Sequence, residues 1–268
     1  MSGRAASLGV LDAILARTRE TVARAKAQRP LDRSHPDVLA APVVRPFATA
    51  LARPGEIRVI AEHKRRSPSR GVIREDLDPA DVARRYERAG AAALSVLTDE
   101  PFFGGQVGHL TVARAATRLP ALRKDFVLEP WQICEGRAAG ADAVLLIVAA
   151  LTGLELHGLL AEAQAVGVDA LVEVHDRLEL ERALGAGARL VGVNNRDLRT
   201  LAVSLETSLE LVPLIPDDVV AVAESGIRGG QDLRRLREAG FDACLVGEHL
   251  MAAPDPGAAL RKLLEEAA

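Results

Sequence analysis

Residues 139–148 read AGADAVLLIV, so that a glycine stands between the end of one segment and an unbroken apolar run of strand length. The same arrangement recurs in four other segments: AGAAALSVL (89–97), VGVDALVEV (166–174), AGARLVGV (186–193) and AGFDACLVG (239–247). A charged amphipathic segment precedes each glycine. Because glycine adopts the left-handed conformation that ends a helix at little cost, each of these glycines marks a helix-to-strand boundary.

The boundaries are separated by about 25 residues or by about twice that, the period of one strand and one helix. Residues 56–268 have room for about eight such units. The strands predicted from this period are 57–62, 92–97, 120–124, 142–147, 169–174, 189–194, 219–224 and 242–246. Most are continuously apolar, as in a parallel sheet that is covered on both faces. With no evident edge strand, the pattern favours an α/β fold closed into a (β/α)8 TIM barrel over an open doubly wound sheet.

The first 55 residues do not follow this period. Apolar or small side chains recur there at helical spacing, at Leu8, Leu11, Leu15, Thr18 and Val22. Pro30 ends this predicted helix, and residues 47–53 predict one more short helix. A helix with a single apolar stripe must pack on something else. We therefore expect 1–55 to be an N-terminal helical extension packed on the barrel of 56–268, with one domain overall.

Composition excludes several classes of protein. The 268 residues match the size of one such barrel, and a net charge of −3 gives no reason to expect nucleic acid or an anionic membrane as a partner. The apolar runs are shorter than the ~20 residues of a membrane helix. Cys134 and Cys244 cannot form a disulfide framework, so we expect a cytoplasmic protein with two buried thiols. No two histidines have metal-ligand spacing, and no metal site is predicted.

Five predicted strands end in polar or ionisable side chains. These are Glu62 with Lys64, then Lys124, Glu173, Asn194 with Asn195, and Glu224. In a parallel barrel the carboxyl ends of all strands share the face on which active sites are built. Side chains two positions apart point to the same side. The pairs on a common side are Glu62 and Lys64, Glu173 and His175, and Asn194 and Arg196.

Lysines and glutamates that converge on one barrel mouth predict a proton-transfer site, because their charges hold or shift each other's ionisation. For any single residue, a structural ion pair that caps the barrel is an equally good interpretation. Five such endings on one face favour the site.

Glycines in the last two units predict a phosphate site. The segment ESGIRGG (224–230) follows the seventh predicted strand, and Gly247 precedes a short predicted helix after the eighth. Barrels of this class hold phosphate at these two loops, where glycine lets backbone N–H groups approach the anion. The hydroxyls of Ser67 and Ser69 are candidate additional donors. The alternative is that the glycines only form a tight turn.

Two aromatic residues stand out in a chain with five Phe, one Trp and one Tyr. Phe103 and Phe126 follow the second and third predicted strands, on the functional face. Core packing is one interpretation, since aromatic side chains are readily buried. An apolar slot for an aromatic ring of a ligand is the other.

Seven segments, in order along the barrel, resemble the motifs of the indole-3-glycerol phosphate synthase family. They are IAEHKRRSPS (60–69), LTDEPFFGG (97–105), LRKDF (122–126), LVEVH (171–175), GVNNRDL (192–198), AESGI (223–227) and LVG (245–247). The segments VLD (10–12) and ARAKAQ (23–28) are similar to the extra N-terminal helix of that family.

The resemblance implies a lyase of tryptophan biosynthesis that needs no cofactor. Its phosphorylated small-molecule substrate is 1-(2-carboxyphenylamino)-1-deoxyribulose 5-phosphate, which ring closure, decarboxylation and dehydration convert to indole-3-glycerol phosphate. The catalytic positions of the family correspond to Glu62, Lys64, Lys124, Glu173, Asn194 and Glu224. Its phosphate contacts correspond to Ser67, Gly226, Gly247 and Glu248. Its other substrate contacts correspond to Phe103, Phe126, Arg196, Leu198, Ser225 and Leu245. We expect a monomer.

Two positions depart from the family pattern. Glu248 stands where many relatives carry a small serine beside the phosphate, and a carboxylate pointing inward would repel that anion. We expect its backbone N–H to bind phosphate and its side chain to point away. The aromatic residue that some relatives supply from the N-terminal helix is absent.

The chemistry assigns different tasks to the two lysines. Ring closure needs an acid at the ketone, and decarboxylation needs a cation that holds the carboxylate. Lys64 shares its side with Glu62, which suits an anion anchor, whereas Lys124 ends another strand near Phe126. We expect Lys124 to be the general acid, Lys64 to hold the carboxylate, and Glu173 to act as the base in dehydration.

Three other functions are less consistent with these residues. A barrel resembling phosphoribosylanthranilate isomerase would place a Cys and an Asp at strand ends, where neither Cys134 nor Cys244 is predicted. A decarboxylase of the orotidine-phosphate type would show Asp-x-Lys after a strand. A binding scaffold without activity would not need the lysines and glutamates, and a turnover assay would distinguish it.

Overall fold

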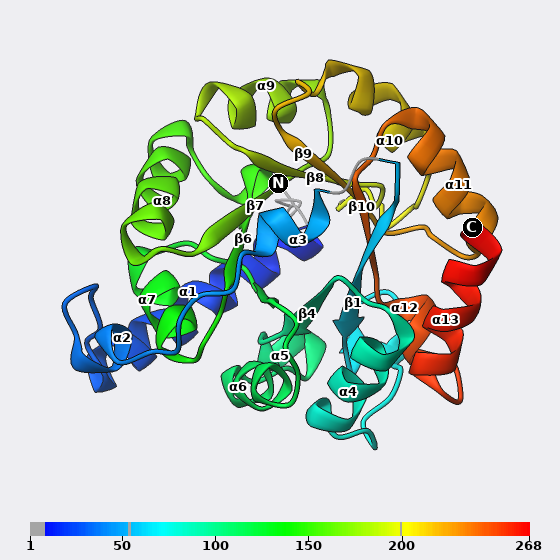
Figure 1. The fold of residues 1–268 in the computed structure, drawn as a ribbon. Coiled ribbons are helices and arrows are strands. Elements are labelled where there is room, and N and C mark those ends of the chain that lie inside the picture. Colours follow the sequence, from blue (N-terminus) through cyan, green and yellow to red (C-terminus); the bar gives the residue numbers. More distant parts are fainter. Residues whose placement is uncertain (1–8, 53–54, 199) are drawn as a thin grey trace, which may run out of the picture.

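The fold is a closed barrel of parallel strands, seen in a computed structural model that describes residues 9–52, 55–198 and 200–268 (Figure 1). Its strands are β1 (Arg58–His63), β4 (Ala93–Leu97), β5 (Ala121–Lys124), β6 (Ala143–Ile147), β7 (Asp169–Val174), β8 (Leu190–Asn194), β9 (Val220–Glu224) and β10 (Ala243–Val246). Each pairs with its neighbours in chain order, and β1 closes the ring by pairing with both β4 and β10. The predicted fold class is confirmed, with strand bounds that differ from the prediction by at most one residue.

Helices surround the barrel. They are α4 (Pro79–Ala89), α6 (Val107–Ala115), α7 (Pro130–Ala138), α8 (Gly153–Val166), α9 (Arg177–Gly185), α10 (Glu206–Leu211), α11 (Gly230–Ala239) and α13 (Pro256–Ala267). Short helices also occur in the loops: α5 (Glu100–Phe103), α12 (Glu248–Met251) and the 3-10 turns η1 (Val148–Ala150) and η2 (Val212–Leu214). Gly90, Gly167 and Gly240 end α4, α8 and α11 in the left-handed conformation, as predicted.

The sequence pattern did not predict a small hairpin in the loop after β1. Between β1 and α4, the two-residue strands β2 (Arg66–Ser67) and β3 (Gly71–Val72) form a small antiparallel hairpin. Strands this short carry no detectable alternation, so sequence periodicity does not reveal them.

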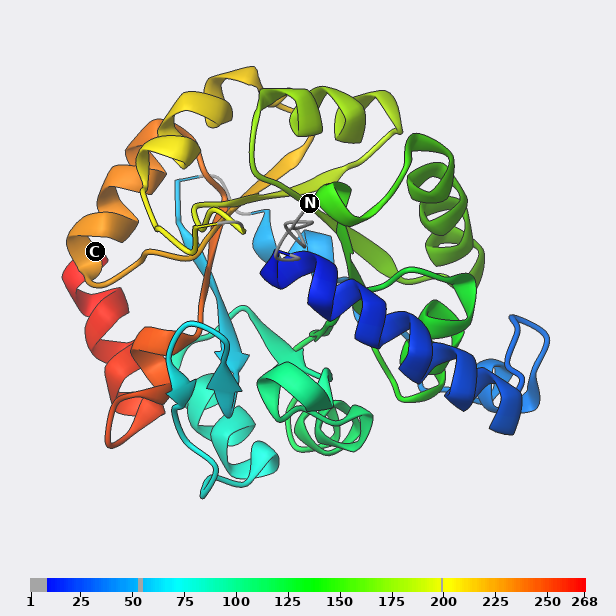
Figure 2. The ribbon, with the colours of Figure 1, turned by 180° about the vertical axis from the view of Figure 1, so that it is seen from behind.

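The N-terminal segment packs against both ends of the barrel. It contains α1 (Val10–Gln28), α2 (Pro36–Leu39) and α3 (Phe47–Leu51). Phe47 and Leu51 of α3 are fully buried and join the barrel's inner core, and the α3 backbone N–H of Ala48 donates to Asp169 at the start of β7. Helix α3 therefore closes the N-terminal end of the strands, and α1 crosses the opposite end (Figure 2). No helix in the described parts of the chain is long and apolar enough to span a bilayer.

Candidate active site

A single pocket at the carboxyl ends of the strands gathers every site residue that the sequence predicted. Its lining includes Glu62, Lys64, Ser67, Phe103, Lys124, Phe126, Glu173, Asn194, Arg196, Leu198, Glu224, Ser225, Gly226, Leu245, Gly247 and Glu248. The strands bring these positions together because parallel strands in register end at one face. Cys134 and Cys244 are buried in α7 and β10 and are absent from the lining of this pocket.

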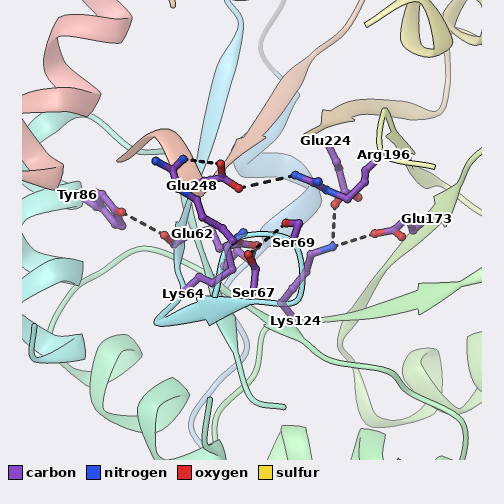
Figure 3. Close-up of polar contacts among 12 residues, drawn as sticks. Glu62, Lys64, Ser67, Ser69, Tyr86, Lys124, Glu173, Arg196, Glu224 and Glu248 are labelled. Atoms are coloured by element: carbon purple, nitrogen blue, oxygen red, sulfur yellow. Dashed lines mark hydrogen bonds and ion pairs between the residues drawn. The ribbon is translucent and has the colours of Figure 1, made fainter. Parts of the chain in front are cut away.

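The Lys124 ammonium contacts both Glu173 and Glu224 (Figure 3). From the end of β5, its Nζ donates to Glu173 Oε2 at 2.9 Å and to Glu224 Oε2 at 2.8 Å. Burial by itself lowers the pKa of Lys124, but the carboxylates of Glu173, Glu224 and Glu62 outweigh burial and raise this pKa above its usual value. The ammonium is therefore charged at neutral pH and contacts two acids at once.

Glu62 and Lys64 form a second ion pair, consistent with the prediction that their side chains point to the same side. Lys64 Nζ donates to Glu62 Oε1 at 2.7 Å, and the Glu62 side chain is only 3% exposed. Glycine at 247 makes room for this carboxylate, since a Cβ there would lie 2.2 Å from Glu62 Oε1. Gly192 on β8 does the same for Glu224, whose Oε1 would lie 2.2 Å from an added Cβ.

The two acids that share Lys124 differ in their ionisation. Burial raises the pKa of both carboxyls. For Glu173, the cations Lys124 and His175 overcome burial and hold the pKa below its usual range. For Glu224, burial, Glu173 and Glu62 outweigh Lys124 and raise the pKa to about 7. Glu224 Oε1 also has no hydrogen-bond partner among the described residues.

The glycine loop and the β2–β3 hairpin lie along the same side of the pocket as Glu248. The hydroxyls of Ser67 and Ser69 are 3.3 Å apart. Ser225 and Gly226 both have positive φ angles, of 64° and 84°, and an added Cβ on Gly226 would lie 2.9 Å from Val203 Cγ1. Backbone strain at a non-glycine residue such as Ser225 is typical of functional loops.

The prediction that the Glu248 side chain points away from the pocket is wrong. Its Oε1 accepts a hydrogen bond from Arg70 at 2.7 Å. Its Oε2 lies 3.8 Å from Arg196 NH2 (Figure 3). Burial raises the pKa of Glu248, but Arg70, Lys64 and Arg196 outweigh burial and lower this pKa below its usual value. The carboxylate is kept at the pocket because cations surround it there.

Phe103 and Phe126 face each other at the apolar side of the pocket. Their ring centroids are 6.2 Å apart, and both side chains are half-buried, although Phe126 also touches the edge of the inner core. Val10, Leu11 and Ile14 of α1 line the same pocket, in place of an aromatic residue. This arrangement favours the slot interpretation over core packing.

Sequence reasoning missed the importance of Arg70 and His175. Arg70 lies in the turn of the β2–β3 hairpin, and only the folded loop brings it to Glu248. His175 Nε2 lies 3.3 Å from Glu173 Oε1, and its Nδ1 lies 3.0 Å from Glu179 Oε2. Its common side with Glu173 was the available signal. Asn194 Oδ1 accepts a hydrogen bond from the backbone N–H of Arg196. Asn195 instead hydrogen-bonds the backbone of Glu224 at the end of β9 and of Ser208 in α10.

Comparisons with known proteins agree with the resemblance seen in the motifs. The sequence model of the family described as indole-3-glycerol phosphate synthase matches residues 11–263. The chain is 51% identical to indole-3-glycerol phosphate synthase of Azoarcus sp., over 95% of this chain and 98% of that protein. It is 50% identical to indole-3-glycerol phosphate synthase 2 of Streptomyces coelicolor, over 96% of this chain and 99% of that protein.

Solved structures with low sequence identity share the fold. The structure of 3-hexulose-6-phosphate synthase from Salmonella typhimurium matches with a TM-score of 0.64 at 14% identity, over 79% of this chain and 98% of that chain. Thiamine phosphate pyrophosphorylase from Pyrococcus furiosus matches with a TM-score of 0.62 at 18% identity, over 83% of this chain and 98% of that chain. At these identities the likeness concerns the barrel alone.

Proposed function

The chain belongs to the indole-3-glycerol phosphate synthase family, and we propose on that basis how its pocket performs the reaction. The enzyme is a lyase of tryptophan biosynthesis that converts 1-(2-carboxyphenylamino)-1-deoxyribulose 5-phosphate to indole-3-glycerol phosphate, carbon dioxide and water. The observation that carries our assignment of roles is Lys124, a buried ammonium in contact with two acids in the pocket.

Lys124 is the general acid of ring closure. As the substituted ring carbon attacks the ketone carbon, the ketone oxygen takes a proton from the Lys124 ammonium and becomes a hydroxyl. The position of Lys124 supports this role, because its side chain lies in the same pocket as the aromatic slot. Glu224 then returns a proton to Lys124 through their 2.8 Å contact.

Lys64 holds the substrate carboxylate until it leaves as carbon dioxide. Loss of carbon dioxide gives its electron pair back to the ring and restores aromaticity. The contact between Lys64 and Glu62 fixes the ammonium at the pocket wall and leaves its other protons for the substrate.

Dehydration depends on the different ionisation of Glu173, which is a carboxylate, and Glu224, which can carry a proton. Lys124, reprotonated by Glu224, gives a proton to the departing hydroxyl, and water leaves. Glu173, the ionised acid, removes the proton whose loss completes the indole double bond. The pKa of about 7 for Glu224 suits a group that gives up a proton near neutral pH.

The phosphate lies at the side of the pocket formed by the hairpin and the glycine loops. Ser67 donates a hydroxyl, and the backbones of Gly226 and Gly247 approach the anion, together with the N–H of Glu248. Arg70 and Arg196 add positive charge on both sides of the Glu248 carboxylate. This charge offsets the repulsion that the carboxylate would otherwise exert on the phosphate.

The anthranilate ring occupies the slot between Phe103 and Phe126. Leu198 and Leu245 line the same pocket and supply further apolar surface. Ser225 and Asn194 contribute by shaping the pocket wall, since Ser225 turns the glycine loop and Asn194 holds the Arg196 backbone.

We further infer that 1–55 and 56–268 form one domain, and that the protein is a cytoplasmic monomer. The burial of α3 in the inner core supports the single domain. Large exposed apolar side chains in the described parts of the chain are scattered over separate elements, as on a typical monomer. Sedimentation or light scattering at several protein concentrations tests the oligomeric state.

The proposal as a whole is tested by incubating the purified chain with the carboxyphenylamino substrate and measuring indole-3-glycerol phosphate by fluorescence and mass. We expect turnover without added cofactor or metal, in the presence of a chelator. Absence of product from a folded protein would contradict the assigned activity.

A further inference from the structure

Glu173 and Glu224 contact the same ammonium but differ in the groups near their other carboxyl oxygen, Oε1. Both Oε2 atoms accept hydrogen bonds from Lys124 Nζ, at 2.9 and 2.8 Å. Both side chains are almost fully buried. One cation cannot neutralise two buried carboxylates, so one of the pair must retain a proton unless a further positive group is present.

A further positive group lies next to Glu173 only. His175 continues from β7 on the same side as Glu173, and its Nε2 is 3.3 Å from Glu173 Oε1. Its Nδ1 is 3.0 Å from Glu179 Oε2, and its backbone N–H donates to the same oxygen at 2.8 Å. The imidazole thus lies between two carboxylates, outside the residues that line the pocket.

Glu224 has no comparable support. Its Oε2 contacts Lys124, while its Oε1 is buried without a hydrogen-bond partner in the described residues and faces the backbone of Gly192. A protonated carboxyl tolerates such a position better than a carboxylate does.

We propose that His175 is a positioning residue that keeps Glu173 as the proton-free carboxylate and thereby leaves the exchangeable proton with Glu224. This inference rests on the roles proposed above for Glu173 as base and for Glu224 as proton donor. His175 does not touch the substrate; it acts through the carboxylate between itself and Lys124. Glu179, in the first turn of α9, keeps the imidazole cationic and oriented.

The ionisation of these groups agrees with that geometry. Burial lowers the pKa of His175, but Glu173 and Glu179 outweigh burial and raise it to about 10, so the ring is cationic at neutral pH. The groups that face Glu173 are Lys124 from β5, Glu224 from β9 and His175. Removing the charge at 175 removes one of two cations, so the pKa of Glu173 rises.

The test compares the pH dependence of kcat in the wild-type enzyme, His175→Gln and His175→Lys. A base must be deprotonated to act, so a raised Glu173 pKa moves the acid limb of the profile to higher pH. For His175→Gln we expect this limb to move up by about one pH unit or more. At pH values below the wild-type midpoint of this limb, we expect kcat of His175→Gln to be about tenfold lower than that of the wild type. At pH 8 we expect it to stay within about threefold of the wild type, with KM little changed.

His175→Lys retains a positive charge, and we expect its acid limb to stay near that of the wild type. Glu179→Gln should shift the limb in the same direction as His175→Gln, by less. His157→Gln is the matched control, because His157 is exposed on α8 and, among the described residues, hydrogen-bonds only a backbone carbonyl of the same helix. Circular dichroism over the same pH range verifies that each variant is folded.

An unchanged acid limb in folded His175→Gln overturns the inference. So does an equal loss of activity in His175→Gln and His175→Lys at all pH values, which is the result of a purely structural role. If His175→Gln does not fold, Glu179→Gln decides by the same criterion. Failure of the wild-type enzyme to turn over the substrate would instead reject the proposed function.

Discussion

The two ends of the barrel both bury charge, but they satisfy it differently. At the N-terminal end, Asp142 is fully buried and accepts hydrogen bonds from Arg114 Nε and NH2 and from the backbone N–H groups of Arg45 and Ala121, at 2.7–3.0 Å. Phe47 and Leu51 close that end. The acid therefore has a full set of donors and an apolar cover, as expected of a structural ion pair.

At the carboxyl end, three buried acids share two lysines, and the imidazole of His175 lies beside one of them. Glu62 pairs with Lys64, while Glu173 and Glu224 share Lys124, and one oxygen of Glu224 has no partner among the described residues. Groups left in excess there are free to exchange protons with a substrate. The comparison teaches that buried charge alone does not mark a site; an incomplete set of partners does.

The largest effect we expect comes from removing Asp142, the acid whose hydrogen-bond donors are all in place at the N-terminal end. Asp142→Ala leaves the Arg114 guanidinium buried without its acid, so the free energy of unfolding should fall by ~3–5 kcal/mol in urea titrations. The kcat of the protein that remains folded should stay within about twofold of the wild type. Asp218→Ala, which removes an exposed pair with Arg189, is the control and should cost under about 1 kcal/mol. A large loss of kcat in folded Asp142→Ala would remove the contrast between the two ends.

Replacing a lysine at the carboxyl end of the barrel should lower kcat more than it lowers the stability of the fold. Lys124→Met should lower kcat by ~100-fold or more with KM little changed, since a positioned proton donor is lost. Lys64→Met should also raise KM, because it removes the cation for the substrate carboxylate. Steady-state kinetics on both variants separates the roles. Near-normal kcat in Lys124→Met together with no activity in Lys64→Met would mean that the two lysines are reversed.

Gly226→Val tests the proposed phosphate site in the pocket. Because φ is 84° and an added Cβ would lie 2.9 Å from Val203, the variant shifts the loop backbone away from the anion. We expect KM to rise by about tenfold or more. Gly158→Ala is the control, since an added Cβ on that α8 glycine meets nothing within 4 Å. Unchanged KM for the phosphorylated substrate would locate the phosphate elsewhere.

Phe126→Ala sharpens the distinction between a ligand slot and a core. The ring is half-buried beside Phe103, so its removal should raise KM several-fold while the melting temperature changes little. Leu122→Ala is the comparison, because Leu122 is fully buried in the inner core and its loss should cost ~2–5 kcal/mol of stability. A Phe126 variant with unchanged KM and a large fall in melting temperature would favour core packing.

The smallest effect concerns Arg70. Arg70→Ala removes an exposed cation that contacts Glu248, so we expect KM to rise about two- to fivefold, more at low salt than at high salt. Arg177→Ala, which removes another exposed arginine, on α9, should leave KM unchanged. If Arg70→Ala lowers KM, Arg70 obstructs the substrate instead of attracting it.

The sequence by itself determined the barrel fold and the end of the barrel at which the site lies. Apolar runs after Gly90, Gly140 and Gly240 carry the strand signal locally, because each strand is buried on both faces and each helix ends at its own glycine. Polar residues at the ends of five strands, such as Lys124 and Glu173, then point to the common face. The fold class alone places these residues together, and all of the predicted site residues line one pocket.

Only the tertiary structure decided which charges meet and which remain incomplete. Lys124 contacts acids 49 and 100 residues away, so its partners depend on closure of the ring. Long side chains then choose among partners within reach: Glu248 turns to Arg70 and Arg196, contrary to the prediction from sequence. The role of His175 is likewise decided by the tertiary structure, because it depends on Glu179 and Glu173 lying on either side of the imidazole ring. Such choices are made by small differences in electrostatic and desolvation energy at short range, which residue order along the chain does not encode.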